Sequence, residues 1–279
     1  MKDFRGKTAI VTGAGSGVGR ALASAAAARG MNVVLADINP TDLRATDEAL
    51  KHTAPTLAVP TDVSSFEAVE HLADEAERAF GNVHLLFNNA GVSSAPKPVW
   101  ESSLADWRWV VGVNQMSVVY GVKAFAPKML EHGEAAHIVN TASIAGLISN
   151  SRMNAYGVTK HAVVALSETL FLDLQEVGAN VGVSVLCPAW VKTNIHLSER
   201  NRPEAGRTDP ATLDATTRVA VETISGWVDA GLEPRDVADT VFEAVENDTF
   251  YILTHPAFNK LVERRVERLL EGNPPEPSW

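Results

Sequence analysis

The sequence predicts an α/β fold with a doubly wound, seven-stranded parallel sheet and helices on both of its faces. Short apolar or β-branched runs alternate with longer helical stretches, as in chains that wind βα units onto a buried parallel sheet. Several helical stretches are followed at once by glycine, which ends a helix at little conformational cost. A chain of 279 residues can form one core, so we expect a single domain over residues 1–279.

Seven segments have the composition expected of buried strands. Each is a short run of apolar or β-branched residues. The predicted strands are KTAIVTG from Lys7, NVVLAD from Asn32, TLAVPTD from Thr56, VHLLFNN from Val83, HIVNTAS from His137, VGVSVLCP from Val181 and FYILT from Phe250.

Helical patterns lie between these strands. They cover residues 18–29, 64–80, 104–131, 155–177 and 211–230, and residues 257–272 predict an amphipathic C-terminal helix. Gly30, Gly81 and Gly178 close three of them. Ser64 followed by Glu67 has the spacing of a capping box, which predicts a helix start there.

One polar stretch interrupts this rhythm. Residues 193–208, TNIHLSERNRPEAGRT, hold no clear strand and precede a helical run. Because doubly wound sheets bind ligands at the carboxyl ends of their strands, we expect residues 194–230 to form a flap over a ligand. An ordinary surface excursion is the alternative. Residues 272–279 predict an extended tail.

Charge and composition exclude several classes of partner. A net charge of −10 argues against nucleic acid, whose binding draws on Lys and Arg. No apolar run approaches the roughly 20 residues that cross a bilayer, and the N-terminus passes straight into a strand without a signal-peptide pattern. A single cysteine, Cys187, excludes an intrachain disulfide. We expect a soluble, cytoplasmic protein, with Cys187 as a buried apolar residue rather than a nucleophile.

The segment TGAGSGVG, from Thr12 to Gly19, joins the first strand to the first helix. Its glycines let the main chain approach a pyrophosphate, and the helix N-terminus favours the negative charge. A glycine cluster alone is weak evidence, but here the strand, the helix and a following acid are all present. The pattern predicts a dinucleotide site of the Rossmann type.

That acid is Asp37, at the end of the second strand. A carboxylate there accepts hydrogen bonds from the adenosine ribose hydroxyls. A ribose phosphate beside it would cost roughly 4 kcal/mol per pair of unit charges at about 4 Å and an effective dielectric of about 20. We expect Ser16 and Ile38 as its neighbours and Arg20 to point to solvent, so the sequence predicts NAD rather than NADP.

Tyr156 and Lys160 lie four residues apart on a predicted helix and therefore share one face. A nearby ammonium, joined by an oxidised nicotinamide, favours the phenolate of a tyrosine whose pKa is ordinarily about 10. Ser143 ends a strand at the ligand edge, where its hydroxyl can bond a substrate oxygen. Each feature is common by itself, since a serine after a strand often caps a helix; the combination predicts general acid–base chemistry at Tyr156.

From about Lys7 to Phe258 the chain resembles the short-chain dehydrogenase/reductase family in its TGAGSGVG loop, its NNAG strand end and its YGVTK helix. The resemblance implies one dinucleotide-binding catalytic domain with Ser143, Tyr156 and Lys160 as its catalytic set. It also implies that Asn114 completes a tetrad by holding a water that links Lys160 to solvent.

The resemblance further implies how the cofactor lies. Asp62 and Val63 contact adenine, Lys160 binds the nicotinamide ribose, and Thr193 binds the carboxamide. The expected cofactor set is Gly13, Ser16, Gly17, Val18, Gly19, Asp37, Ile38, Asp62, Val63, Asn89, Ala90, Gly91, Tyr156, Lys160, Pro188, Val191 and Thr193. Where many relatives have Pro-Gly, this chain has Pro188-Ala189, which we expect to narrow the nicotinamide pocket if the φ of Ala189 is negative.

The substrate pocket is expected around the same centre. Its predicted residues are Ser93, Ser94, Ser143, Ile144, Ala145, Tyr156, Trp190, Ile195 and His196. An indole beside the reacting carbon suits a bulky or hydrophobic secondary alcohol or ketone, although Trp190 could instead pack the base of the flap. A lone flap histidine such as His196 is more often solvated, and the histidines show no metal-like clustering, so no catalytic metal is expected.

Three other interpretations remain open at this point. An NADP-dependent carbonyl or 3-oxoacyl thioester reductase is disfavoured by Asp37. A non-catalytic NAD-binding regulator would be expected to lack Tyr156, Lys160 or Ser143, and all three are present. A structural role through the helices 104–131 and 155–177 can coexist with catalysis, and we expect a homo-oligomer, a dimer or tetramer.

Overall fold

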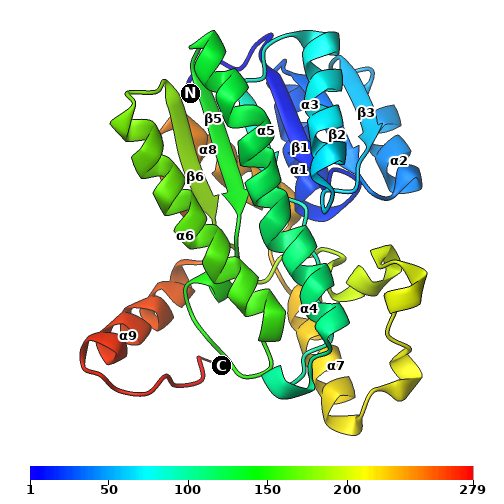
Figure 1. Cartoon of the computed structure of the whole chain (residues 1–279), viewed down its shortest axis with the longest axis vertical. Helices are drawn as coiled ribbons and strands as arrows, with labels where there is room; N and C mark the ends of the chain where they lie inside the picture. Colours follow the sequence, from blue (N-terminus) through cyan, green and yellow to red (C-terminus); the bar gives the residue numbers. More distant parts are fainter. Residues whose placement is uncertain (279) are drawn as a thin grey trace.

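A computed structural model describes residues 1–278, and its centre is a parallel sheet of seven strands (Figure 1). The strands are β1 (Thr8–Thr12), β2 (Asn32–Asp37), β3 (Thr56–Pro60), β4 (Leu85–Asn88), β5 (Ala136–Thr141), β6 (Val181–Leu186) and β7 (Tyr251–Ile252). Their order is β3-β2-β1-β4-β5-β6-β7. The chain therefore winds outward from β1 in both directions, which confirms the doubly wound sheet and its seven predicted strands.

The register brings the carboxyl ends of the central strands to one edge. Thr12 of β1 pairs with Ala36 of β2, and Asn88 of β4 pairs with Asn140 of β5. All the ladders are parallel. The loops that leave these ends therefore meet along a single crevice at the point where the strand order reverses, between β1 and β4.

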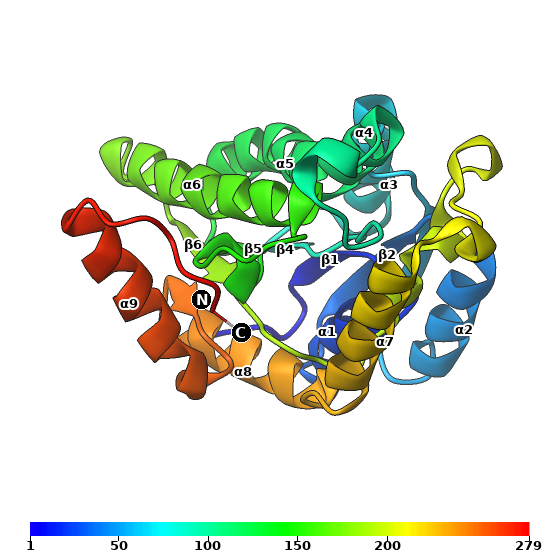
Figure 2. The same ribbon diagram turned by 90° about the horizontal axis from the view of Figure 1, so that it is seen from below.

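Alternate residues of each strand enter two separate cores. Val11 and Leu35 pack with the helices on one face, and Ile10 and Val34 pack with those on the other. Figure 2 shows α1, α2 and α8 below the sheet and α3, α5 and α6 above it. Because both faces are covered, the strands are apolar throughout rather than alternating.

The helices mostly begin and end close to the predicted positions. They are α1 (Gly17–Ala28), α2 (Pro40–Leu50), α3 (Phe66–Phe80), α4 (Leu104–Val111), α5 (Ser117–His132), α6 (Asn154–Glu176), α7 (Ala215–Asp229), α8 (Pro234–Glu246) and α9 (Asn259–Leu270). The predicted cap at Ser64 is wrong by one residue, because Ser65 accepts the hydrogen bond from the Ala68 amide. The predicted helix 104–131 is interrupted by a π-helical turn, Gly112–Met116.

Two helices, α2 and α8, were not predicted from the pattern. α2 is largely polar, and its start depends on Asn39, whose side chain accepts from the Thr41 and Asp42 amides ahead of a proline at the first turn. α8 begins at Pro234 and buries one apolar face against α1. Neither helix ends at a glycine, so the strongest stop signal was missing.

The predicted flap consists of short 3₁₀ turns followed by a helix. The turns are Ile195–Asn201, Glu204–Gly206 and Pro210–Thr212, and α7 follows. After α9 the tail returns to the body, where the Ser278 amide donates to Asn150 Oδ1. Among residues 1–278 no helix is long and apolar enough to cross a membrane.

Candidate functional site

A cavity of about 950 Å³ opens at the carboxyl edge of the sheet. Its walls include every predicted cofactor residue and every predicted substrate residue. Asn114 is the exception among the predicted site residues, since it lies buried behind the wall. The chain thus brings into one crevice residues that lie far apart in the sequence, such as Ser16 and Arg200, which are 184 positions apart.

The loop between β1 and α1 requires its glycines. Gly13 and Gly17 have φ values of +67° and +52°, which side chains rarely adopt. A methyl group at Gly19 would collide with the Gly13 carbonyl oxygen. Asn89, at the end of β4, holds the loop from the other side by donating to the Thr12 carbonyl over 2.9 Å. The loop is therefore a main-chain cradle in front of a helix N-terminus, which fits a pyrophosphate.

Asp37 is held in place beside this loop. Its Oδ2 accepts from the Gly15 amide over 2.8 Å, and its Oδ1 accepts from the Asn39 amide over 2.9 Å. Arg20 does not simply point to solvent, since its guanidinium donates to the Gly15 carbonyl and to Thr46 Oγ1. Arg20 thus stabilises the outer side of the loop. The carboxylate of Asp37 lines the cavity at this end.

The predicted catalytic side chains meet at the centre of the cavity. Ser143, just after β5, accepts from the Ala145 amide over 3.1 Å. Tyr156 and Lys160 project from the first turns of α6, and the Lys160 ammonium lies 5.6 Å from the centre of the Tyr156 ring. Lys160 is buried and donates to the Thr141 carbonyl over 2.9 Å. Two hydroxyls and a fixed amine therefore line one cavity, an arrangement that suits acid–base chemistry.

Burial dominates the electrostatics of the two titratable side chains, Tyr156 and Lys160. Burial raises the pKa of Tyr156, and the Ser143 hydroxyl opposes this rise through a hydrogen bond. Burial also lowers the pKa of Lys160 to about 8. In the protein's own residues burial is the dominant effect on Tyr156, and the Lys160 ammonium bonds to Thr141 rather than to the phenol. The expectation that this ammonium and an oxidised nicotinamide together favour the phenolate stays a prediction.

Asn114 lies in the π-helical turn between α4 and α5. Its side-chain oxygen accepts from the Val92 main-chain amide over 2.8 Å, and its Nδ2 donates to the Val92 carbonyl over 2.9 Å and to Thr159 Oγ1 over 3.3 Å. A methyl group at Gly91 would lie 3.6 Å from both Asn114 Oδ1 and the Lys160 ammonium. Asn114 is thus close to Lys160 and fixes the loop that follows the NNAG sequence, without lining the cavity.

The flap is fastened over the cavity at several points. A methyl group at Gly17 would lie 2.9 Å from Thr193 Cγ2, so the start of the flap packs on the glycine loop. Ser93 Oγ donates to the Ile195 carbonyl over 2.9 Å. Arg200, which the sequence analysis did not single out, reaches back to Ser16 Oγ at 3.4 Å. The basic side chain of Arg200 therefore lies beside the glycine loop, where the phosphates of a dinucleotide are expected.

The flap also contains its own ion pairs. Arg202 is buried, and its guanidinium pairs with Asp106 at 2.7 Å and with Glu199 at 3.0 Å. The same guanidinium stacks over the Trp109 ring at 4.8 Å. These contacts join the flap to α4. The charge of Glu199 at the cavity wall is therefore paired with Arg202.

The substrate half of the cavity has walls that the sequence did not reveal. Trp190 packs on Trp227 of α7 with ring centres 5.0 Å apart, and both line the cavity. Further walls come from the loop before α6, from α7 and from the residue Leu213 ahead of it, namely Asn150, Ser151, Arg152, Met153, Leu213, Ala220, Val221, Thr223, Ile224 and Val228. His196 is half-buried rather than solvated, and its Nδ1 has no hydrogen-bond partner among the described residues.

Ala189 takes the place that glycine has in the Pro-Gly pattern. It is not among the non-glycine residues with positive φ, so alanine fits without strain, as expected. Its amide donates to His255 Nδ1 over 3.2 Å. The segment Pro188-Ala189 is therefore fixed to the turn after β7.

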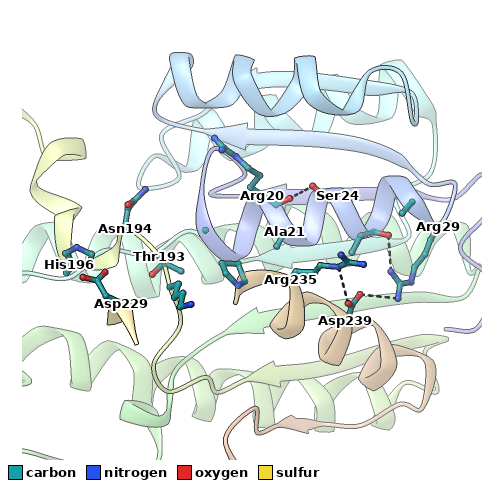
Figure 3. Close-up of a pocket in the computed structure, with 15 residues that line it drawn as sticks. Arg20, Ala21, Ser24, Arg29, Thr193, Asn194, His196, Asp229, Arg235 and Asp239 are labelled. Carbon is teal, nitrogen blue, oxygen red and sulfur yellow. Dashed lines mark hydrogen bonds and ion pairs between the residues drawn. The ribbon is translucent and has the colours of Figure 1, made fainter. Parts of the chain in front are cut away.

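A second hollow lies on the outer side of the glycine loop (Figure 3). It measures about 870 Å³ and runs between α1 and α8, and it shares Gly17, Thr193, Asn194 and His196 with the main cavity. Its charges are partly paired, since Asp239 lies 4.0 Å from Arg29 and 3.8 Å from Arg235. None of the residues predicted to be catalytic lines it.

Comparisons with known proteins agree with this geometry. Residues 7–204 match the family model for short chain dehydrogenases. The chain is 37% identical to the CLA biosynthesis dehydrogenase/reductase of Lactiplantibacillus plantarum, over 99% of this chain and 97% of that protein. It is 30% identical to the C alpha-dehydrogenase of Sphingobium sp. strain SYK-6, over 100% and 90%. A short chain dehydrogenase/reductase from Burkholderia phymatum, solved in complex with NAD, superposes with a TM-score of 0.95 at 49% identity, covering 99% of this chain and 98% of that one.

Proposed function

Because this chain belongs to the short-chain dehydrogenase/reductase family, we propose that it is an NAD-dependent oxidoreductase that interconverts a bulky secondary alcohol and its ketone. The observation that carries the proposal is that the glycine loop, Asp37 and the group Ser143, Tyr156 and Lys160 all open onto one cavity. A cofactor laid along the loop would end beside the tyrosine.

The cofactor end fits NAD. The glycines leave room for a pyrophosphate, Asp37 presents a carboxylate where the ribose hydroxyls would lie, and Arg200 supplies a positive charge beside Ser16. When bound, NAD exchanges the hydride with the substrate carbon and, in its oxidised form, places a positive charge beside Tyr156. We assign Arg200 to the phosphates, because it stands at the glycine loop rather than at Asp37.

The protein's own groups handle the oxygen and the proton. In the oxidation direction the Ser143 and Tyr156 hydroxyls hold the alcohol oxygen, and Tyr156 takes its proton as general base. Lys160 holds the ribose side of the site and keeps a positive charge near the phenol. Because the Asn114 side-chain amide is occupied by Val92 and Thr159, we assign to its main-chain carbonyl the role of holding the water that passes the proton outward.

The substrate half favours an apolar, bulky alcohol. Trp190 and Trp227 present two indoles to the cavity, and Ile144 and Ala145 line it as well. Burial of such a surface favours binding at roughly 25 cal/mol per Å² of apolar area. Small polar alcohols would leave most of this surface in contact with water.

The test is turnover of purified protein with NAD or NADP across aliphatic, aryl, steroid, terpene and polyol secondary alcohols, followed by absorbance of the reduced nicotinamide. We expect turnover of bulky apolar alcohols with NAD. Binding of NAD without turnover of any alcohol would favour a regulatory protein. A higher kcat/KM with NADP, combined with preferred reduction of carbonyl or 3-oxoacyl thioester compounds, would favour that class of reductase.

We also propose that the enzyme is a homo-oligomer that uses the outer faces of α4, α5 and α6. Large apolar side chains are exposed there, including Leu104, Leu130, Val158 and Leu172. Exposed apolar groups clustered on neighbouring helices are typical of subunit contacts. Light scattering on the purified protein should give a mass of two or four chains, and a monomer at micromolar concentration would contradict this.

A further inference from the structure

Arg152 stands apart from the other charged residues of the main cavity. Within the described part of the chain the charged side chains at its wall are Asp37, Asp62, Arg152, Lys160, Glu199 and Arg200. Five of these belong to the cofactor end, the catalytic centre or the ion pair within the flap. Arg152 lies in the substrate half and has no role in the function proposed above.

The contacts of Arg152 leave most of its guanidinium available. The residue is half-buried, and Nη1 donates to the Pro96 carbonyl over a long 3.3 Å. Hydrogen bonds from the Thr217 side chain and main chain lower the pKa of Asp214, and the charge of Arg152 lowers it slightly further. Asp214 is directed to the start of α7, where it accepts from the Thr217 amide and hydroxyl. The guanidinium is therefore near enough to the start of α7 to interact with the charge of Asp214, but it has no close carboxylate partner among residues 1–278.

The main chain holds this side chain in place. Arg152 and Asn154 have φ values of +65° and +33°, which non-glycine residues adopt only when the surroundings impose them. Asn154 donates to the Ala95 carbonyl over 3.0 Å and accepts from Ser94 Oγ at 3.3 Å. The loop before α6 is thus joined to the segment 94–96, and the exposed Ser151 beside Arg152 places both at the rim of the cavity.

From this placement we propose that Arg152 binds a carboxylate carried by the alcohol substrate at the end remote from the reacting carbon. The inference rests on the proposed function and names its substrate class as bulky, apolar hydroxy acids. A guanidinium presents a planar set of donors that matches a carboxylate. A neutral apolar substrate filling the cavity would strip water from Arg152 without replacing its hydrogen bonds, which is unfavourable.

The reacting end cannot be the place for this anion. A carboxylate beside Tyr156 would oppose formation of the phenolate, whose pKa burial already raises. The Lys160 ammonium beside Tyr156 already donates to the Thr141 carbonyl, whereas Arg152 has no close carboxylate partner among residues 1–278. The guanidinium in the substrate half is therefore the better partner for the acid, and it orients the substrate in one direction.

The test compares an acid with its neutral ester. The probes are para-carboxyphenyl methyl carbinol and its biphenyl homologue, each as the free acid and as the methyl ester, with NAD as cofactor. In wild-type protein at least one acid should exceed its ester in kcat/KM. Arg152→Met, which keeps the length of the side chain and the backbone strain, should lower the acid-to-ester ratio about ten- to a hundredfold, mainly through KM of the acid.

Two further variants distinguish a direct contact between Arg152 and the carboxylate from a general effect of positive charge. Arg152→Lys should retain part of the preference, because it keeps the positive charge but loses the planar donor set. Lys97→Met removes a cation next to Pro96, whose carbonyl Arg152 contacts, and Lys97 does not line the cavity, so the ratio should be unchanged. An unchanged acid-to-ester ratio in Arg152→Met, or a preference of the wild type for the esters, would overturn the inference. Turnover of the esters would in that case still support the proposed function. Failure of wild type to oxidise acids and esters alike would overturn the proposed function as well.

Discussion

The ammonium of Lys160 donates a hydrogen bond to the carbonyl oxygen of Thr141 over 2.9 Å. This bond holds a buried amine at the end of β5, beside Tyr156. Burial lowers the pKa of Lys160 to about 8, so keeping the charge at neutral pH destabilises the folded state. The proposed catalytic centre therefore opposes stability, as is common for functional sites.

Replacing this lysine should separate stability from activity. Lys160→Met should remove nearly all turnover and raise the free energy of unfolding at pH 7. The pKa of Lys160 is about 8 in the folded chain and 10.5 in the unfolded chain. Below pH 8 the lysine is charged in both, and this difference lowers the free energy of unfolding by about 3 kcal/mol. Loss of the bond to Thr141 offsets about 1 kcal/mol. We expect a net gain of about 2 kcal/mol.

Urea unfolding at several pH values checks this prediction. Between about pH 8 and 10.5 only the unfolded chain binds the proton, so wild-type stability rises with pH and the advantage of the variant shrinks. Lys51→Met, which removes an exposed lysine paired with Glu48, is the control and should change stability by less than about 0.5 kcal/mol. A destabilised Lys160→Met, or a gain independent of pH, would contradict the account.

Asp37 is predicted to decide between NAD and NADP. Asp37→Asn removes the charge and can accept only one of the two amide hydrogen bonds from Gly15 and Asn39. We expect kcat/KM for NAD to fall about tenfold and the ratio of NADP to NAD to rise at least about tenfold, because the repulsion of a ribose phosphate is relieved. Asp42→Asn, outside the cavity wall, should leave the ratio unchanged. An unaltered ratio in Asp37→Asn would mean that another group selects the cofactor.

Arg200 is predicted to bind the cofactor phosphates from the flap. Arg200→Gln should weaken binding of ADP-ribose and NAD about tenfold, the usual range for a charge-assisted hydrogen bond. Binding of adenosine, which has no phosphate, should not change. Calorimetric titration with the three ligands measures this, with Arg218→Gln on α7 as an exposed control. Equal weakening of adenosine and ADP-ribose would show that the variant acts through the fold of the flap.

Trp227 is predicted to select bulky substrates. Trp227→Ala should raise KM for bicyclic or aryl alcohols about tenfold, because an indole that packs on Trp190 and lines the cavity is lost. Small alcohols such as isopropanol should show little change. Trp100→Ala removes a tryptophan that is 84% exposed and should leave both KM values as they are. A uniform effect on all alcohols would argue against a direct contact.

The sequence predicted those parts of the molecule that depend on local pattern. The seven strands, the glycine loop and Asp37 could be located because each needs particular residues at fixed spacing along one βα unit. Trp227, Arg152 and Arg200 could not, because they reach the cavity only when α7 and the loops pack over the sheet. The same holds for the pKa of Tyr156, since burial depends on neighbours far away in the chain.

The helices that escaped prediction show a related limit. α2 carries few apolar residues, and its start depends on Asn39 and Pro40 rather than on periodicity. The π-helical turn at Gly112–Met116 follows from how α4 and α5 pack around Asn114, and the apolar pattern of residues 104–131 gave no sign of it.

The central claim is that Tyr156 moves the proton of the alcohol. The most direct measurement is kcat for a bulky secondary alcohol with NAD in Tyr156→Phe, beside Tyr251→Phe as the matched control. Tyr251 bonds to Glu168 on the surface, outside the cavity wall. The account predicts a loss of at least about a hundredfold in Tyr156→Phe with NAD still bound, the range expected for a lost general base, and near-normal kcat in Tyr251→Phe. Full turnover by Tyr156→Phe would contradict it.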